Sequence, residues 1–289
     1  RDLSPDIVGV HASGITGPPS LGAPTVVFRN NRNGTFTNSA ASLNAGAQID
    51  GMGVTIADLH NDGDWDVFVP NIANGHVLLV WNTPTGNFTT GAQPWSVAST
   101  YGLFTGQTGW ACRFFDYNND RTNDLFVTHN PGTARLFQGN ATTGFFTDVS
   151  FTTIYTPTLQ PLLPGGWGAG AVDYDNDGDV DLYSVGGPTS AQLCANPGNL
   201  NKWLTVVLQG TLSNRSGIGA TVICKSPSAT QRRQVISGEG FLMDGDRRPH
   251  FGLGTDPIVT ELEIRWPSGT VQYLSNVATN QILTVTEPT

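Results

Sequence analysis

Apolar residues along the chain occur in short runs separated by stretches rich in Gly, Asn, Asp, Ser and Thr. The longest runs, such as Val77 to Trp81, hold about five residues and favour Val, Leu and Phe. Apolar positions do not recur at the 3.6-residue spacing of an amphipathic helix. Short runs of β-forming residues bounded by turn residues predict strands, so the pattern predicts an all-β fold with many loops.

A nine-residue acidic segment repeats in register within this pattern. The three copies run from Asp58 to Asp66, from Asp116 to Asp124 and from Asp173 to Asp181, and they start 58 and 57 residues apart. An apolar run rich in β-forming residues follows each copy at once. Each segment is therefore predicted to be a loop that joins two strands.

A weaker repeat adds two further strands to each unit. It consists of an apolar run followed by Phe-Thr, at Phe36-Thr37, Phe88-Thr89 and Phe146-Thr147. Units of about 57 residues with four strands are typical of propeller blades, which bury both faces only by packing on neighbouring blades. We therefore predict about three propeller-type blades. Three are too few to close a ring, so open ends with an exposed apolar face are expected. The missing blades would then lie upstream in a longer precursor or be supplied by other chains, or these blades would stack differently from a closed propeller.

The spacing of oxygen-bearing side chains in the loops is suited to calcium, which takes roughly six to eight oxygen ligands. The third loop has the complete pattern, whereas the second has Arg121 where a Gly would ease the turn. The first has His60 at its third position, and calcium disfavours nitrogen ligands. We expect up to three Ca²⁺ ions, with the third loop the strongest site and the first the weakest. The candidate ligands are Asp58, His60, Asp62, Asp64 and Asp66, then Asp116, Asn118, Asp120 and Asp124, then Asp173, Asp175, Asp177, Asp179 (through its backbone carbonyl) and Asp181.

An EF-hand is excluded as an alternative for these loops. It requires a Glu at the twelfth position and helices on both sides. Here the twelfth position is Val69, Val127 or Ser184, and the flanking segments are predicted strands. The remaining alternative is a set of acidic turns without a metal, which three copies in register disfavour.

The charge of the chain is concentrated in the same loops. The net charge is -9, and the loops hold twelve of the 23 acidic residues. Carboxylates packed so closely repel one another without a cation, so we expect stability to depend on calcium. With only 14 Lys and Arg residues, the chain does not have the character of a nucleic-acid binder. No apolar run is long enough for a membrane-spanning helix.

The last third of the chain is also predicted to be β-structure. From Glu261 to Trp266 apolar and charged residues alternate, as in a half-buried strand. A small β-sandwich or barrel beside the blades accounts for this region. The predicted organisation is an N-terminal arm or partial blade over 1–25, calcium-binding blades over 26–198 and a β domain over 199–289.

These motifs resemble two known families. The acidic loops, the third of them preceded by Gly166-Trp-Gly168, resemble the FG-GAP and VCBS repeats, which form calcium-binding blades in integrin α-subunits and in secreted bacterial proteins. The remainder resembles the ASPIC/UnbV domain of the cartilage acidic protein family. The motifs that carry this second likeness are Lys202-Trp-Leu, Ser213 to Ala220, His250-Phe-Gly-Leu-Gly254 and Trp266-Pro-Ser-Gly269.

The resemblance implies an extracellular or cell-surface calcium-binding protein with a structural or adhesive role. Its blades would serve as an interaction or assembly surface for a protein partner or for self-association. One alternative is a subunit of an extracellular filament or multi-chain complex whose blades are completed in trans. Another is a carbohydrate-binding lectin, or a sugar lyase or isomerase, with His129, Trp81 and Trp95 as a ligand surface. The sequence shows no nucleophile in a recognisable setting, so no catalytic residue is assigned and an enzymatic role stays open.

Overall fold

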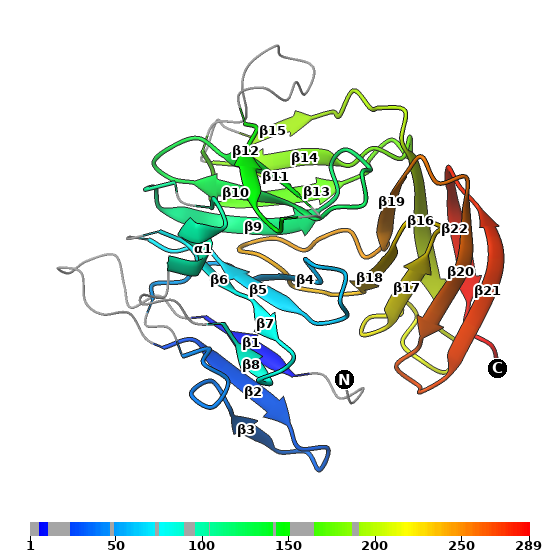
Figure 1. Cartoon of the computed structure of the whole chain (residues 1–289), viewed down its shortest axis with the longest axis horizontal. Coiled ribbons are helices and arrows are strands. Elements are labelled where there is room, and N and C mark those ends of the chain that lie inside the picture. Colours follow the sequence, from blue (N-terminus) through cyan, green and yellow to red (C-terminus); the bar gives the residue numbers. More distant parts are fainter. Residues whose placement is uncertain are drawn as a thin grey trace.

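The computed structural model describes residues 6–10, 24–46, 49–72, 75–89, 96–103, 105–140, 143–150, 165–186 and 191–289. Within these ranges the regular secondary structure consists of β-strands and one short helix, α1 (Ser96–Thr100) (Figure 1). The predicted all-β class is therefore confirmed. In this part of the chain no helix has the length and apolar character to cross a membrane.

Four blade-like units follow one another along the first two thirds of the chain (Figure 1). In each unit neighbouring strands are antiparallel and their order follows the sequence. Unit 1 contains β1 (Ile7–Gly9), β2 (Val26–Asn30) and β3 (Phe36–Asn38). Unit 2 contains β4 (Thr55–Ala57), β5 (Asp66–Val69) and β6 (Val77–Leu79), followed by the pair β7 (Trp81–Asn82) and β8 (Asn87–Phe88). Unit 3 contains β9 (Gly109–Phe115), β10 (Asp124–His129), β11 (Arg135–Gly139) and β12 (Phe146–Asp148), and unit 4 contains β13 (Gly168–Val172), β14 (Asp181–Val185) and β15 (Ala191–Cys194).

Each pair of neighbouring units shares one hydrophobic core. Between units 2 and 3, Phe68 and Leu78 pack with Leu125 and Phe137. Separate cores of the same kind lie between units 1 and 2 and between units 3 and 4. The units therefore stack face to face as propeller blades do, and the described residues do not close into a ring (Figure 1).

The C-terminal region forms a two-sheet sandwich. One sheet has the order β19-β16-β22 and the other β18-β17-β20-β21, and a core that includes Trp266, Phe251 and Leu204 lies between them. The strands are β16 (Lys202–Gln209), β17 (Thr221–Lys225), β18 (Thr230–Gln234), β19 (His250–Gly254), β20 (Ile258–Arg265), β21 (Val271–Ala278) and β22 (Gln281–Thr286).

One segment of the C-terminal region, 236–249, leaves the sandwich and crosses the first strands of the blades. Figure 1 shows this gold-coloured connection passing between β4 and β9. The Gly240 N–H donates to the Val54 carbonyl at 2.9 Å, and Glu239 pairs with Arg113 of β9 at 3.0 Å. The segment thus connects unit 2 to unit 3 beside the first strand of each unit.

Candidate metal centre

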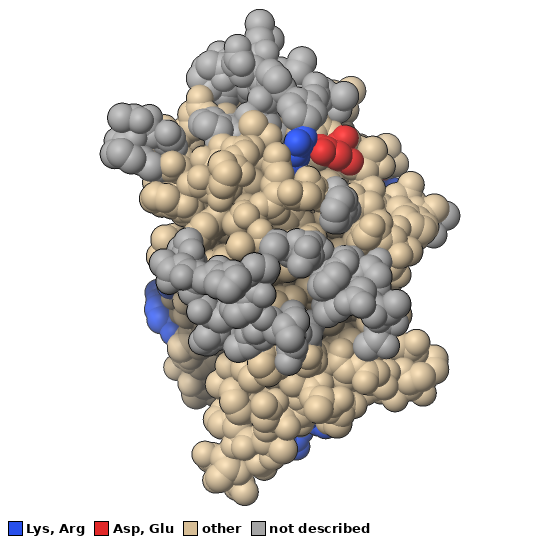
Figure 2. Space-filling view, turned by 90° about the vertical axis from the view of Figure 1, so that its left-hand side faces the viewer, with Lys and Arg blue, Asp and Glu red and all other residues tan. Residues whose placement is uncertain are grey.

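The three acidic loops lie at the ends of units 2, 3 and 4 that face the sandwich (Figure 1). As predicted, they connect the first strand of each unit to the second. Figure 2 shows the side of the molecule remote from the sandwich, where the described residues carry only isolated charged groups. The acidic residues of the three loops therefore lie at the blade ends that face the sandwich.

The loops share one backbone conformation. Their fourth position is Asn in every copy, with φ of 54, 57 and 64° at Asn61, Asn119 and Asn176. Their sixth position has φ of 88, 80 and 93° at Gly63, Arg121 and Gly178. Asn and Gly enter this left-handed region most readily. Arg121 adopts the same turn as the two glycines, so its departure from the pattern leaves the loop conformation unchanged.

The first and fifth carboxylates hold each loop closed. In the third loop the Asp173 carboxylate accepts the N–H groups of Asp177 and Gly178, both at 3.1 Å. The Asp177 carboxylate in turn accepts the Asp179 N–H at 2.9 Å. The same bonds recur in the first and second loops at 2.8–3.0 Å.

The ninth carboxylate ties each loop to the body of its blade. Its Oδ2 accepts the N–H of the second loop position at 2.9–3.2 Å. Its Oδ1 accepts a backbone N–H fifteen residues later, at 2.7–2.9 Å. The pairs are Asp66 with Trp81, Asp124 with Gly139 and Asp181 with Asn196. These three aspartates therefore position the loop, whether or not they also contact an ion.

The third loop presents a compact set of oxygen ligands. Carboxylate oxygens of Asp173, Asp175 and Asp177 all lie within 4.8 Å of one another. In the described part of the chain this is the one cluster of three or more His, Cys, Asp or Glu side chains with such spacing. Calcium binds oxygen at about 2.3–2.6 Å, so oxygens up to about 5 Å apart can share one ion. The donor set and its spacing fit calcium.

The other two loops place different groups at the third position. In the second loop the Asn118 amide donates to Asp120 Oδ2 at 3.0 Å. In the first loop His60 Nδ1 lies 3.4 Å from Asp66 Oδ2, and this hydrogen bond raises the pKa of His60. The side chain at the third position therefore pairs within its own loop in both cases.

Burial disfavours the charge of several loop carboxylates. It raises the pKa of Asp58 to about 6 and that of Asp181 to about 6. Burial, together with repulsion from Asp120, raises the pKa of Asp116 to about 7. A cation bound among these groups would favour their ionised forms and reverse the shift.

The sandwich contacts the loops through groups that are not candidate ligands. Arg248 donates to the Asn176 side-chain oxygen at 2.6 Å and to the Asp173 backbone carbonyl at 2.7 Å. Arg232 donates to the Gly63 carbonyl. His250 Nε2 lies 2.7 Å from the Asn119 side-chain oxygen. Basic residues of the C-terminal region thus lie against all three loops.

The structure adds residues that the sequence analysis missed. Asp6 stands directly before β1, as Asp124 stands at the start of β10, and its Oδ1 accepts the Asn30 N–H at 2.8 Å. This is the bond that the ninth aspartate makes in the other units, so unit 1 is a fourth repeat. The signal was present in the sequence, because Asp6-Ile-Val resembles Asp66-Val-Phe. The Asn at the fourth position of every loop was a second overlooked signal.

The proposed ligand surface of His129, Trp81 and Trp95 does not come together in the described residues. His129 is 0% exposed, because the end of β10 lies against the neighbouring unit, where the His129 and His76 Nε2 atoms are 3.2 Å apart. Its imidazole therefore does not face solvent. Trp81 is half-buried with its ring against Phe88, and Trp95 lies outside the described residues.

Two family models match the chain. A model described as FG-GAP-like repeat matches residues 1–69 and 116–184, and one described as ASPIC and UnbV matches residues 210–289. The chain belongs to the proteins that combine FG-GAP-like repeats with an ASPIC and UnbV domain. The repeats correspond to the blade-like units, and the ASPIC and UnbV match covers most of the sandwich.

Curated relatives match both parts of this FG-GAP-like and ASPIC/UnbV arrangement. The chain is 30% identical over 288 residues to Cartilage acidic protein 1 of Mus musculus, and 26% identical over 282 residues to Cartilage acidic protein 1 of Xenopus tropicalis. Each match covers 91% of this chain. The chain spans 41% and 40% of the length of these two relatives.

Proposed function

We propose that this protein is an extracellular calcium-binding structural protein whose blades serve as an interaction surface in adhesion or assembly. The observation that carries the calcium part is the cluster of Asp173, Asp175 and Asp177, whose oxygens lie within 4.8 Å of one another. Similarity to proteins named Cartilage acidic protein 1 supports an extracellular setting and a structural role.

Calcium in the third loop would be held by side-chain oxygens of Asp173, Asp175 and Asp177, with the Asp179 carbonyl and Asp181 as further candidates. The ion supplies positive charge among carboxylates whose ionised forms are disfavoured by burial and by one another. Its role in this proposal is to stiffen the loop.

A stiff loop also supports the sandwich. Arg248 bonds to the backbone of Asp173 and to the side chain of Asn176, both in the third loop. The Trp203 ring lies so close to Gly178 that a Cβ there would meet it at 1.8 Å. Calcium at the neighbouring carboxylates would therefore stabilise the arrangement of the two domains as well as the loop.

Calorimetric titration of the full chain with calcium tests this proposal. Asp175→Asn should weaken the strongest site at least tenfold, because it removes a charged ligand from an exposed position without a core role. Asp148→Asn is the matched control, since Asp148 lies on β12 and pairs with Arg135 at 3.3 Å. The proposal would be contradicted if titration with calcium gave no heat of binding, or if the two substitutions changed the calcium affinity equally.

A further inference from the structure

The second acidic loop, Asp116 to Asp124, has Arg121 at its sixth position, where the other two loops have Gly. Arg121 adopts φ of 80°, a conformation that Gly reaches at a lower cost. Its Nη1 atom donates to the Leu253 carbonyl of the sandwich at 3.2 Å and lies 3.6 Å from Asp256 Oδ2. The turn therefore contains an unfavourable residue whose side chain reaches the C-terminal domain.

The acceptor of this contact is fixed by its own neighbours. The Ser226 and Ser228 hydroxyls donate to the Asp256 carboxylate at 2.6 and 2.7 Å, and Asp256 is 5% exposed. Burying a carboxylate is costly unless a cation pairs with it, and Arg121 supplies that cation. A Cβ at position 254 would lie 2.7 Å from Arg121 Nη1, so Gly254 leaves the space that the guanidinium occupies.

Three further hydrogen bonds join the second loop to the C-terminal domain. The Gly254 N–H donates to the Asn119 carbonyl at 2.8 Å, and His250 Nε2 lies 2.7 Å from Asn119 Oδ1. The Asn201 side-chain amide donates to the Asn118 carbonyl at 2.8 Å. The third, fourth and sixth positions of the loop are thus all bonded to the C-terminal domain.

The sandwich also packs on the first carboxylate of this loop. Gly252 of β19 lies so close to Asp116 Oδ2 that a Cβ at position 252 would overlap it. Asp116 is buried, and Asn118 and Asp120 are half-buried. Burial and repulsion from Asp120 raise the pKa of Asp116, and the Arg233 guanidinium of β18 opposes this shift. A basic group of the sandwich therefore supplies positive charge near this carboxylate.

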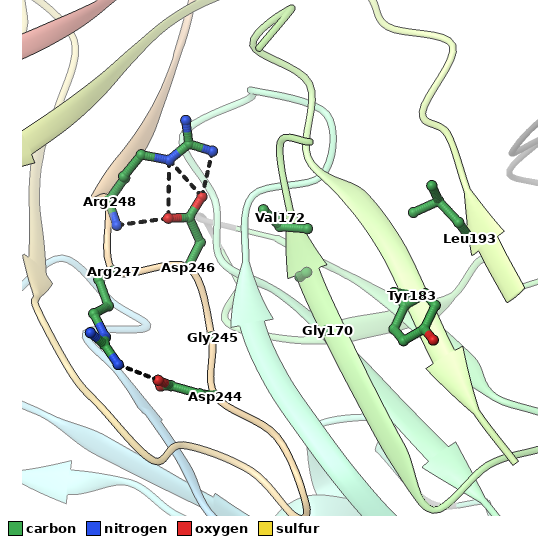
Figure 3. A pocket seen from close by; sticks show the side chains of 10 residues that line it. Gly170, Val172, Tyr183, Leu193, Asp244, Gly245, Asp246, Arg247 and Arg248 are labelled. Atoms are coloured by element: carbon green, nitrogen blue, oxygen red, sulfur yellow. Dashed lines mark hydrogen bonds and ion pairs between the residues drawn. The ribbon is translucent and has the colours of Figure 1, made fainter. Parts of the chain in front are cut away.

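The third loop contacts the sandwich in a different way. Arg248, which pairs with Asp246 in Figure 3, donates to the Asp173 backbone carbonyl at 2.7 Å. Asp175 and Asp177 are exposed, in contrast to the half-buried third and fifth positions of the second loop. The third loop therefore keeps two carboxylates open to solvent while it contacts the C-terminal domain.

These differences divide two roles between copies of one repeated loop. We propose that the second loop binds the C-terminal sandwich in place of calcium, with Arg121 as the docking residue, while the third loop keeps the ion. The calcium part of this proposal rests on the function proposed above. The docking part depends only on the contacts between the second loop and the sandwich.

Amide hydrogen exchange in the full chain, followed by NMR, tests the docking role. Arg121→Gly removes the guanidinium and keeps the turn, because φ of 80° suits Gly. The Gly254 amide should exchange about tenfold faster than in the wild type, because it donates to the second loop and a charged hydrogen bond beside it is lost. Arg247→Gly is the matched control, because Arg247 pairs with Asp244 instead of the loop (Figure 3). Unchanged exchange in Arg121→Gly, or equal acceleration in both variants, would overturn the docking role.

Calorimetric titration with calcium tests the division of roles. Asp120→Asn and Asp177→Asn change the fifth position of the second and third loops, and Asn keeps an oxygen that can accept the loop N–H. Asp177→Asn should weaken calcium binding by about tenfold or more, because it removes a charged ligand, whereas Asp120→Asn should leave affinity and stoichiometry unchanged. A weaker affinity or a lost ion in Asp120→Asn would overturn the proposal. A wild-type chain that binds no calcium would count against the calcium proposal alone, and the exchange experiment would decide the docking role.

Discussion

His76 and His129 form a buried pair that should make the fold sensitive to acid. Their Nε2 atoms lie 3.2 Å apart, and the Thr105 hydroxyl lies 3.1 and 3.2 Å from the two rings. His129 Nδ1 lies 2.9 Å from the Thr133 carbonyl. Both histidines are 0% exposed. Burial lowers the pKa of His76 to about 3 and that of His129 to about 4, so both are neutral in the folded protein near neutral pH.

The direction and size of the effect follow from these pKa values. Between pH 6.5 and the folded pKa the unfolded chain binds more protons than the folded one, so stability is complete above about pH 6.5 and falls with pH below it. One pKa unit corresponds to about 1.4 kcal/mol. Because pH 5 lies about 1.5 units below the unfolded histidine pKa of 6.5, the pair should lower the free energy of unfolding at pH 5 by about 4 kcal/mol.

Urea unfolding of the wild-type chain and of the double variant His76→Gln/His129→Gln, at pH 7.5 and pH 5, measures this effect. The loop carboxylates and His250 also titrate, but they are present in both proteins and cancel in the difference. The wild type should lose about 4 kcal/mol more than the double variant between the two pH values. The single variant His129→Gln should show about half of that difference. An equal loss in the wild type and the double variant would refute the reasoning.

Three further predictions concern the loops. Asp124→Ala should lower the free energy of urea unfolding by about 4 kcal/mol, because it leaves the N–H groups of Tyr117 and Gly139 without a hydrogen-bond acceptor, at roughly 1–3 kcal/mol each. A decrease below 1 kcal/mol would contradict the role of Asp124 in holding the loop to its blade. Gly178→Ala should weaken calcium binding in calorimetry, because φ is 93° and Trp203 fills the space, and unchanged affinity would argue against it. Removing calcium with EDTA should lower the free energy of unfolding by about 2.7 kcal/mol per site relative to calcium at a hundredfold excess over Kd. Urea unfolding curves that coincide with and without calcium would contradict this prediction.

The repeated part of the fold could be predicted because each strand and loop recurs at a fixed spacing. The Asp, Asn and Gly residues from Asp173 to Asp181 predict a turn, and the apolar runs on either side are short and rich in β-forming residues. The strands β13 and β14 lie where this pattern places them. Local sequence was sufficient here because these features depend on residues close in the chain.

Contacts between distant segments could not be predicted in the same way. His129 differs from its counterparts in the other units, which suggested an exposed ligand position, but its partner His76 lies 53 residues earlier in the chain. Arg248 reaches the third loop from a segment 72 residues away from Asn176. Such pairings depend on how the units stack and on where the sandwich docks, and no local pattern encodes either.

Anomalous diffraction from crystals of the full chain grown in calcium tests whether the third acidic loop holds calcium, as proposed. We expect an anomalous peak among the side-chain oxygens of Asp173, Asp175 and Asp177, and loss of that peak in Asp175→Asn. A loop of the same conformation with no peak at saturating calcium would contradict calcium binding at this loop.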